Sequence, residues 1–346
     1  MRPVPGQGRF FLPFIQEVTM YTIRDVARLS GVSRSTVSRV LNNHPYVSDE
    51  KRKRVEEAIK QLHFTPNQIS SHFRLKRTGS IGIIVPYLSH PYFAELAGVL
   101  SEESHNCGYK PVLFQTFGDR HQEIDVFEKW KRKELDALIV TSSSLNQVEL
   151  DEMSTNGILV ICNEAYQSSN IDVFCLNEKK AAFKSVEYLI KKGRRRIAFC
   201  SDFLPSPSQQ ERLIGYKLAH QEHQLTWNEQ FIFDKIATID DGYTLGKELC
   251  KTDAIDAVFS GSDFVAAGYL KAAHECGISV PTDLSIIGFD NHSISNITSP
   301  AITTITNRTQ EMAKDLVHTL EIRLSGQDKP FEWKQYEGKL LIKGSA

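Results

Sequence analysis

The spacing of apolar residues along the chain changes near residue 80. Before that point, apolar residues recur at helical spacing in three short runs within residues 22–62. After it, short continuous apolar runs alternate with helical stretches. Such an alternation is typical of parallel sheets that are covered on both faces by helices. The pattern therefore predicts a small helical unit followed by a larger α/β unit.

Six apolar runs in the second part have the length and composition of buried strands. They are residues 81–85, 135–140, 158–162, 196–200, 257–260 and 284–289. Spread over residues 80–346, these strands fit two doubly wound lobes better than one. The expected fold class is α + α/β, with a helical head and then two doubly wound α/β lobes.

The three helical runs have ends that the sequence marks. Thr22 can cap the first run, with an acidic residue three positions later as in a capping box. Gly31 ends that run, Ser33 can cap the second, and Ser48 opens the third. A tight turn between two short helices predicts a helix-turn-helix.

The second of these helices carries residues that suit a DNA-reading element. Arg34, Ser35, Ser38 and Arg39 lie on its outer side near the N-terminal end, which is the end that enters the major groove in this motif. An arginine can bind guanine O6 and N7 with two hydrogen bonds, and hydroxyls can hold phosphates. Two arginines alone would equally suit an ordinary solvated helix face.

The charge distribution favours DNA binding. Residues 20–79 hold twelve Lys or Arg and five Asp or Glu, a balance of +7, although the whole chain carries −1. A basic head on an acidic body suggests that the head meets a polyanion. Residues 1–19 are expected to be a disordered tail or a misassigned start, because Met20 opens the first patterned segment.

Composition and motifs narrow the remaining classes. No run approaches the roughly 18 apolar residues of a membrane helix. The six cysteines form no CxxC pair, which fits reduced thiols in a cytoplasmic protein and no zinc site. The GxGxxG, P-loop, HExxH and GxSxG motifs are absent from the sequence. We therefore expect a protein that is not an enzyme and needs no metal or cofactor.

A basic segment joins the two parts of the chain. Residues 67–79 are interpreted as a hinge between the helix-turn-helix domain, residues 20–66, and the body, residues 80–346. The segment is short and sparsely apolar, so alone it is at best a marginal helix. We expect it to order on contact with a partner.

Both parts of the chain resemble the lactose-repressor (LacI/GalR) family of bacterial regulators. The resemblance implies a sequence-specific DNA-binding repressor whose body is a periplasmic-binding-protein-like sensor of a small molecule. The motifs that carry it are Asp25-Val26-Ala27, Gly31-Val32-Ser33, residues 36–42, Tyr46-Val47-Ser48, Thr65-Pro66-Asn67, and residues 81–86, 91–96 and 286–291.

The resemblance implies roles for individual head and hinge residues. Arg34 and Ser35 match the pair with which the family reads bases, and Arg39 matches its base-contacting arginine. Ser70 and Phe73 match hinge positions that enter the minor groove, where the family usually has Ala and Leu. Because Phe is a known intercalating wedge, kinking of the DNA is still expected. The predicted DNA-binding set is completed by Thr22, Thr36, Ser38, Asn42 and Tyr46.

The resemblance also implies an effector site between the two lobes. Its aromatic, polar and charged members would be Tyr92, Phe93, Asn163, Arg212, Asp263 and Asp290. Asp263 belongs to the Asn-Asp pair of the family, in which Ser262 replaces the Asn here. Aromatics bind the apolar face of a sugar ring and paired polar groups bind vicinal hydroxyls, so this set suits a sugar or an amino sugar.

Two heads on a symmetric homodimer would read a near-palindromic double-stranded operator. No leucine heptads follow the last strand-like run, so a dimer is expected rather than a tail-linked tetramer. The sequence leaves open control of the regulator by a protein co-repressor. Two rival hypotheses are a solute-binding protein of the same body fold and a sugar-modifying enzyme with an added head.

Overall fold

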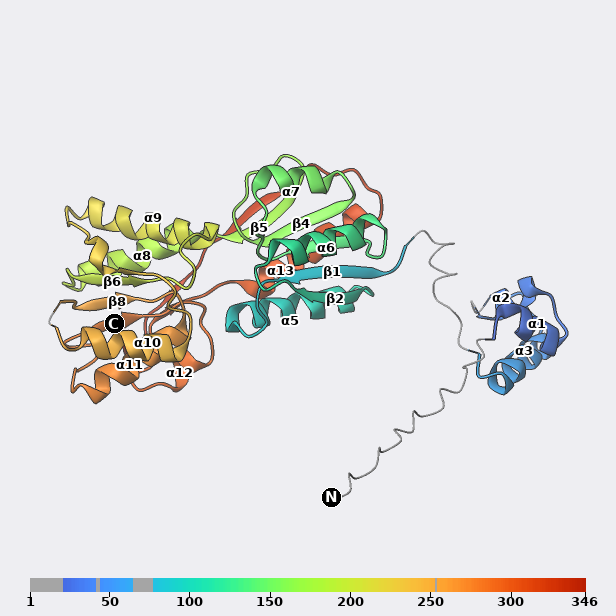
Figure 1. Ribbon diagram of the computed structural model, residues 1–346, viewed down its shortest axis with the longest axis horizontal. Helices are drawn as coiled ribbons and strands as arrows, with labels where there is room; N and C mark the ends of the chain where they lie inside the picture. The colour runs from blue at the N-terminus through green and yellow to red at the C-terminus, as the bar shows by residue number, and fades with distance from the viewer. Residues whose placement is uncertain (1–20, 42–43, 65–76, 253) are drawn as a thin grey trace, which may run out of the picture. The chain divides into compact units, whose positions relative to one another are not determined.

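The computed structural model describes residues 21–41, 44–64, 77–252 and 254–346. The chain divides into two compact units, residues 1–76 and residues 77–346 (Figure 1). Each unit has its own hydrophobic core. We call the first unit the head and the second the body.

The head is built from three helices around a small core. They are α1 (Ile23–Ser30), α2 (Arg34–Leu41) and α3 (Asp49–Gln61). The side chains buried between them come from every helix and are Val26, Ala27, Val37, Val40, Val55 and Ala58. The predicted helix-turn-helix is thus confirmed in the part of the head that the structure describes.

Local hydrogen bonds explain where the head helices begin and end. The Asp25 carboxylate accepts a hydrogen bond from the Thr22 backbone nitrogen at 2.9 Å, as the capping-box pattern predicts. Ser33 Oγ accepts a hydrogen bond from the Thr36 backbone nitrogen at 3.1 Å and caps α2. Gly31 ends α1 at φ 65°, in the left-handed region that favours glycine.

The first lobe of the body contains a six-stranded parallel sheet in the order β11-β5-β4-β3-β1-β2. Residues Ile81 and Ile83 of β1 face α5, while Ile84 faces α6, so the strand is buried on both sides. The strands are β1 (Ser80–Val85), β2 (Lys110–Gln115), β3 (Ala137–Val140), β4 (Ile158–Asn163), β5 (Asp172–Leu176) and β11 (Trp333–Tyr336). The helices are α5 (Pro91–Asn106), α6 (Arg120–Lys131), α7 (Gln147–Ser154) and α13 (Thr309–Leu324).

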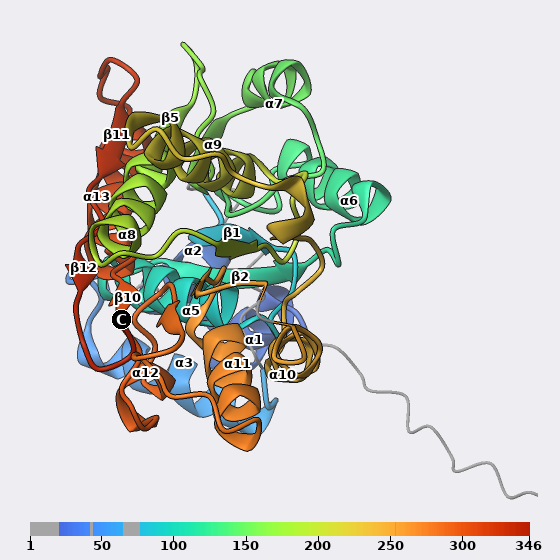
Figure 2. The same ribbon diagram turned by 90° about the vertical axis from the view of Figure 1, so that its left-hand side faces the viewer.

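The second lobe contains a four-stranded parallel sheet in the order β7-β6-β8-β9. In Figure 2 this lobe faces the viewer, with α8 and α9 on one side of its sheet and α10 and α11 on the other. The strands are β6 (Ile197–Cys200), β7 (Ile232–Phe233), β8 (Ala257–Phe259) and β9 (Ser285–Ile287). The helical segments are α8 (Glu178–Lys191), α9 (Pro207–Glu222), η1 (Glu229–Phe231), α10 (Ile239–Leu249), α11 (Asp263–Glu275) and α12 (Ile294–Ile297).

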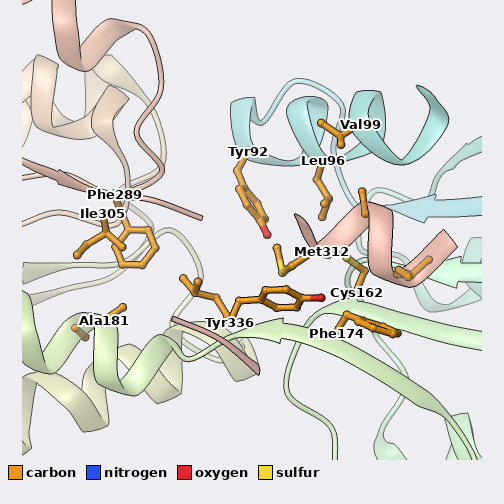
Figure 3. Close-up of a cluster of buried hydrophobic side chains, with 14 of the residues drawn as sticks. Tyr92, Leu96, Val99, Cys162, Phe174, Ala181, Phe289, Ile305, Met312 and Tyr336 are labelled. Carbon is orange, nitrogen blue, oxygen red and sulfur yellow. The ribbon is translucent and has the colours of Figure 1, made fainter. Parts of the chain in front are cut away.

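The chain passes between the lobes after β5, before α13 and after β11. A short antiparallel pair, β10 (Thr304–Ile305) with β12 (Leu340–Leu341), lies near these crossings. One hydrophobic cluster contains residues of both lobes, and Figure 3 shows Tyr92 and Leu96 from α5 on one side of it and Phe289 and Ile305 on the other. The two-lobed body predicted from the strand pattern is therefore confirmed.

All six predicted strands are present. The structure also contains strands that the sequence analysis did not predict, among them β2 and β5. Strand β2 lies at the edge of its sheet, where the side chains of both Lys110 and Leu113 are exposed, and its apolar run, residues 112–114, is short. Strand β5 begins with the buried Asp172, and the Arg323 guanidinium binds that carboxylate at 2.9 and 3.0 Å. This charged residue at the start of β5 interrupts the apolar pattern by which a buried strand is recognised.

Residues 77–79, which the sequence assigned to the hinge, belong to the body and form hydrogen bonds with its other residues. The Asp136 carboxylate accepts hydrogen bonds from the backbone nitrogens of Thr78 and Gly79 at 2.7 and 2.8 Å. Arg77 donates to the Leu324 carbonyl. The hinge residues 67–76 lie outside the described residues. Within the described residues, no helix combines the length and the hydropathy needed to cross a membrane.

Candidate functional site

The outer face of α2 presents the predicted base-reading residues to solvent. Arg34, Ser35 and Arg39 are exposed, while Val37 and Val40 on the opposite face are buried in the head core. The core therefore fixes the orientation of the helix, and its arginines point away from the fold. This is the arrangement in which a recognition helix can enter a major groove.

The other predicted DNA-binding residues flank this face or fall outside the described residues. Thr22 is exposed at the start of α1, and Tyr46 is 85% exposed in the turn before α3. Thr36 and Ser38 are half-buried, and the Thr36 hydroxyl lies 2.9 Å from Ser33 Oγ. Asn42, Ser70 and Phe73 lie outside the described residues, so their predicted contacts remain predictions.

The body holds a small polar cavity whose lining comes from both lobes. It lies where strands β4 and β6 end and helices α5 and α9 begin. Its volume is about 30 Å³, which is room for only a few waters. A sugar therefore requires the lobes or the lining side chains to move. The lining residues are His90, Tyr92, Phe93, Asn163, Asp202, Ser208, Gln209, Arg212, Gly261 and Asp290.

On the side of the first lobe, Tyr92 and Asn163 form a buried pair. The Tyr92 hydroxyl donates a hydrogen bond to Asn163 Oδ1 at 2.6 Å, and Asn163 Nδ2 donates to the Thr141 carbonyl at 3.2 Å. Burial raises the pKa of Tyr92 well above its ordinary value, so the hydroxyl keeps its proton. Phe93 is half-buried beside Tyr92, with ring centres 5.4 Å apart.

On the side of the second lobe, Arg212 of α9 is held by several contacts. Its Nε and Nη2 donate to the Glu178 carboxylate at 2.7 and 3.3 Å, and its Nη1 donates to the Gly261 carbonyl at 3.0 Å. Its guanidinium carbon lies 3.5 Å from the centre of the Phe289 ring. The predicted effector clamp thus lines the cavity, although three of its five N–H donors are already used within the protein.

Asp290 follows the last strand of the second sheet and is almost fully buried. Its backbone has φ 94°, and its Oδ1 accepts a hydrogen bond from Asn307 Nδ2 at 2.5 Å. Burial raises the pKa of the Asp290 carboxyl, while the charges of Arg212 and His292 oppose that effect. This carboxylate is a costly buried anion that a cation or a hydrogen-bond donor would stabilise.

Asp263 is not among the residues that line the cavity. It is fully buried behind the Asp290 loop, where its Oδ2 accepts a hydrogen bond from the His292 backbone nitrogen at 2.8 Å. Burial raises its pKa to about 7. The sequence places Asp263 in an effector-contacting set, whereas in the structure its carboxylate is bonded to the backbone of the loop that carries Asp290 and His292.

Sequence reasoning missed several residues of the lining. His90 and Asp202 face each other across the lobes, with His90 Nε2 3.4 Å from Asp202 Oδ2. Asp202 comes two residues after a strand, a position where ligand-binding side chains gather in parallel sheets, and this signal was available. Gln209 precedes Arg212 by three residues and so shares its helix face. Nothing in the sequence alone indicated Glu178.

Comparison with known proteins agrees with the described geometry. The model of bacterial regulatory proteins of the lacI family matches residues 22–67, and the model of periplasmic binding protein-like domains matches residues 186–346. The NTD biosynthesis operon regulator of Bacillus subtilis is 38% identical over 89% of this chain and 94% of its own length. The ribose operon repressor of Halalkalibacterium halodurans is 32% identical over 94% of this chain and 96% of its own length.

Solved structures share the fold. The lac repressor dimer bound to operator matches with a TM-score of 0.81 and 21% identity, covering 94% of this chain and 99% of that chain. A LacI family regulator from Lactobacillus casei with bound sucrose matches with a TM-score of 0.72 and 27% identity, covering 78% of this chain and 100% of that chain.

A helix-turn-helix head joined to a two-lobed sensor body defines the class of this protein as a DNA-binding transcription regulator with a ligand-binding domain. The chain belongs to the lacI family of bacterial regulatory proteins.

Proposed function

We propose that this regulator represses genes of sugar or amino-sugar metabolism, and that a sugar-like effector bound in the cavity between the lobes controls its hold on DNA. The observation that carries the proposal is the convergence of Tyr92, Asn163, Arg212 and Asp290 on one buried cavity. Such a concave site with few, well-placed polar groups is the usual form of a small-molecule site. The LacI family regulator from Lactobacillus casei, crystallised with sucrose and with glucose, supports a carbohydrate as the effector class.

The proposed contacts follow from the chemistry of the lining. Phe93 is half-buried and can offer a ring face to the apolar side of a sugar, as can the more deeply buried Tyr92. Asn163 and Asp290 can bind hydroxyls, and the remaining Arg212 N–H groups can donate to ring or hydroxyl oxygens. Asp263 acts through the loop that it supports rather than by contact.

The proposed output is a homodimer in the bacterial cytoplasm whose two heads read a near-palindromic operator. Effector binding changes the angle between the lobes and thereby the spacing of the segments that lead to the heads. The two binding events are then linked, so an effector that weakens operator binding must itself bind the operator complex more weakly.

The experiment begins by selecting an operator from random double-stranded DNA with the purified full chain. Binding is then titrated by fluorescence anisotropy with and without a panel of sugars and amino sugars. A palindromic operator whose affinity changes with one compound supports the proposal. If DNA binds but no compound changes its affinity, the effector proposal fails and a protein co-repressor replaces it. If no palindrome is selected, the assignment of the recognition helix fails.

A further inference from the structure

Part of the hydrogen-bonding capacity of the cavity lining is already used within the protein. Arg212, the main cationic donor in the lining, already gives three N–H groups to Glu178 and Gly261. The Tyr92 hydroxyl donates its hydrogen bond to Asn163, and the Asn163 amide donates one to the Thr141 carbonyl. Arg212 therefore keeps two N–H groups for a ligand, and Asn163 keeps one.

Acceptors without a partner lie in the same lining. Gln209 is 5% exposed, and among the described residues its Oε1 is a buried oxygen with no hydrogen-bond partner. His90 Nδ1 is likewise buried without a partner, and it is a lone-pair acceptor when the Nε2 proton points at Asp202. Asp290 Oδ2 lies 3.7 Å from His292 Nε2, beyond normal hydrogen-bond distance. Buried acceptors of this kind are costly until a donor reaches them.

The formal charge around the cavity has the same sign as these acceptors. Asp202 and Asp290 line it, and Glu178 lies directly behind Arg212. Arg212 balances Glu178, and Asp202 faces His90 Nε2 at 3.4 Å, which balances that carboxylate only when the His90 ring is protonated. His292, behind Asp290, is shared with the Glu95 carboxylate at 3.1 Å, so it balances Asp290 only in part. A cationic ligand would complete the charge balance of this cavity.

From this lining we infer that the effector carries a protonated amino group, held by the Asp202 and Asp290 carboxylates with Gln209 as a specificity-determining residue. The inference rests on the proposed function and narrows it from sugars in general to amino sugars with a free amine. An ammonium group donates up to three hydrogen bonds and brings the missing positive charge. A hydroxyl brings one donor and no charge, and an N-acetyl group brings one donor and extra bulk.

The test measures binding of matched sugars to the full chain by isothermal titration calorimetry. Glucosamine, galactosamine and mannosamine are each compared with the parent hexose and with the N-acetyl derivative. We expect at least one free amine to bind about tenfold or more tightly than both of its counterparts, because hydrogen bonds to charged groups contribute more than neutral ones.

Variants assign the preference to the named side chains. Gln209→Met keeps the length of the side chain but removes its polar atoms, and should weaken binding of the amine about tenfold. Gln210→Met is the matched control, since Gln210 is the exposed next residue of the same helix, and should leave that binding nearly unchanged. Asp202→Asn should reduce the ratio of amine to hydroxyl affinity, whereas a purely structural role would weaken both sugars equally.

The possible outcomes test the amine inference and the proposed sugar-effector function separately. A parent hexose or N-acetyl sugar that binds as tightly as its free amine overturns the inference and leaves the sugar-effector proposal intact. Equal effects of Gln209→Met and Gln210→Met overturn the role of Gln209. Absence of binding by every sugar overturns the sugar-effector proposal itself, and the inference falls with it.

Discussion

Single side chains determine both ends of the proposed signal. On α2, Val37 and Val40 anchor the helix while Arg34 and Arg39 stay in solvent, so binding energy at DNA is separated from the stability of the head. In the body, ligand binding is not separated from stability in this way, because the candidate binding residue Asp290 is buried and bonded within the fold. Substitution of the exposed arginines of the head should therefore be nearly silent for folding, whereas truncation of buried side chains in the cavity should not.

Arg39→Ala should weaken operator binding while leaving the unfolding of the head unchanged. Loss of a bidentate contact to guanine costs about 1–3 kcal/mol and relaxes specificity at one base pair. Arg28→Ala, an exposed arginine of α1, removes the same charge and should weaken binding evenly across sequences. Anisotropy titrations on operator and on scrambled DNA distinguish the two variants. Equal operator affinities of Arg39→Ala and the unmodified chain would contradict the assignment of α2.

Asp290→Asn should abolish the response to effector and keep operator binding. The substitution preserves the shape of the side chain but removes the charge from a buried site, so the loss concerns the ligand more than the fold. Asp240→Asn, an exposed carboxylate of α10, serves as the control. Calorimetry with the effector and anisotropy with the operator measure the two properties separately. A normal effector response of Asp290→Asn would refute the assigned site.

At the scale of elements, the cavity forms where parallel strands end. Asp202 follows β6 and Asp290 follows β9 in the second sheet, while Asn163 closes β4 in the first, so the strand ends of the two sheets meet at the cavity. The segment after β9 also reaches the first lobe through His292, which lies 3.1 Å from Glu95 of α5. The His292–Glu95 pair thus links the loop that carries Asp290 to a helix of the opposite lobe.

The His292–Glu95 pair predicts a pH-dependent stability of the body. Burial lowers the pKa of His292, but the Glu95 hydrogen bond and the charge of Asp290 outweigh it and raise that pKa overall, while the His292 hydrogen bond lowers the pKa of Glu95. The His292 contribution is complete below its ordinary pKa of about 6.5 and disappears as pH rises through the raised value. The Glu95 contribution is complete above its ordinary pKa of about 4.3 and disappears as pH falls through the lowered value.

Urea unfolding of the unmodified chain and of His292→Gln tests this expectation. The difference in unfolding free energy should be largest between about pH 4.5 and pH 6.5 and should shrink at higher pH. His318→Gln is the control, because His318 is exposed on α13 with Glu321 at 4.0 Å. A difference that stays constant up to about pH 9 would show that the pair contributes nothing by charge.

Elements with strong periodicity were predictable and those defined by tertiary contacts were not. The six buried runs became strands, whereas β2 has a mixed, partly exposed edge sequence and β11 pairs with β5, which lies far away in sequence. In the site, the resemblance to a family supplied Tyr92, Asn163 and Asp290. The burial of Gln209 depends on how α9 packs, and the pairing of Glu178 with Arg212 depends on two helices that the sequence does not place side by side.

At the scale of the whole molecule, function requires that the cavity and the recognition helix influence each other. The cavity of about 30 Å³ is too small for a sugar, so ligand entry requires movement of the lobes or of the lining side chains. A ligand shifts such an equilibrium only by the difference between its affinities for the two states. The linkage can therefore be measured from either end of the molecule.

The most direct measurement determines operator affinity with and without saturating effector, together with effector affinity for the free chain and for its operator complex. We expect both pairs of dissociation constants to differ by the same factor, on the order of 5 to 150. An effector that binds in the cavity while operator affinity stays the same would contradict the central claim that the body controls the head.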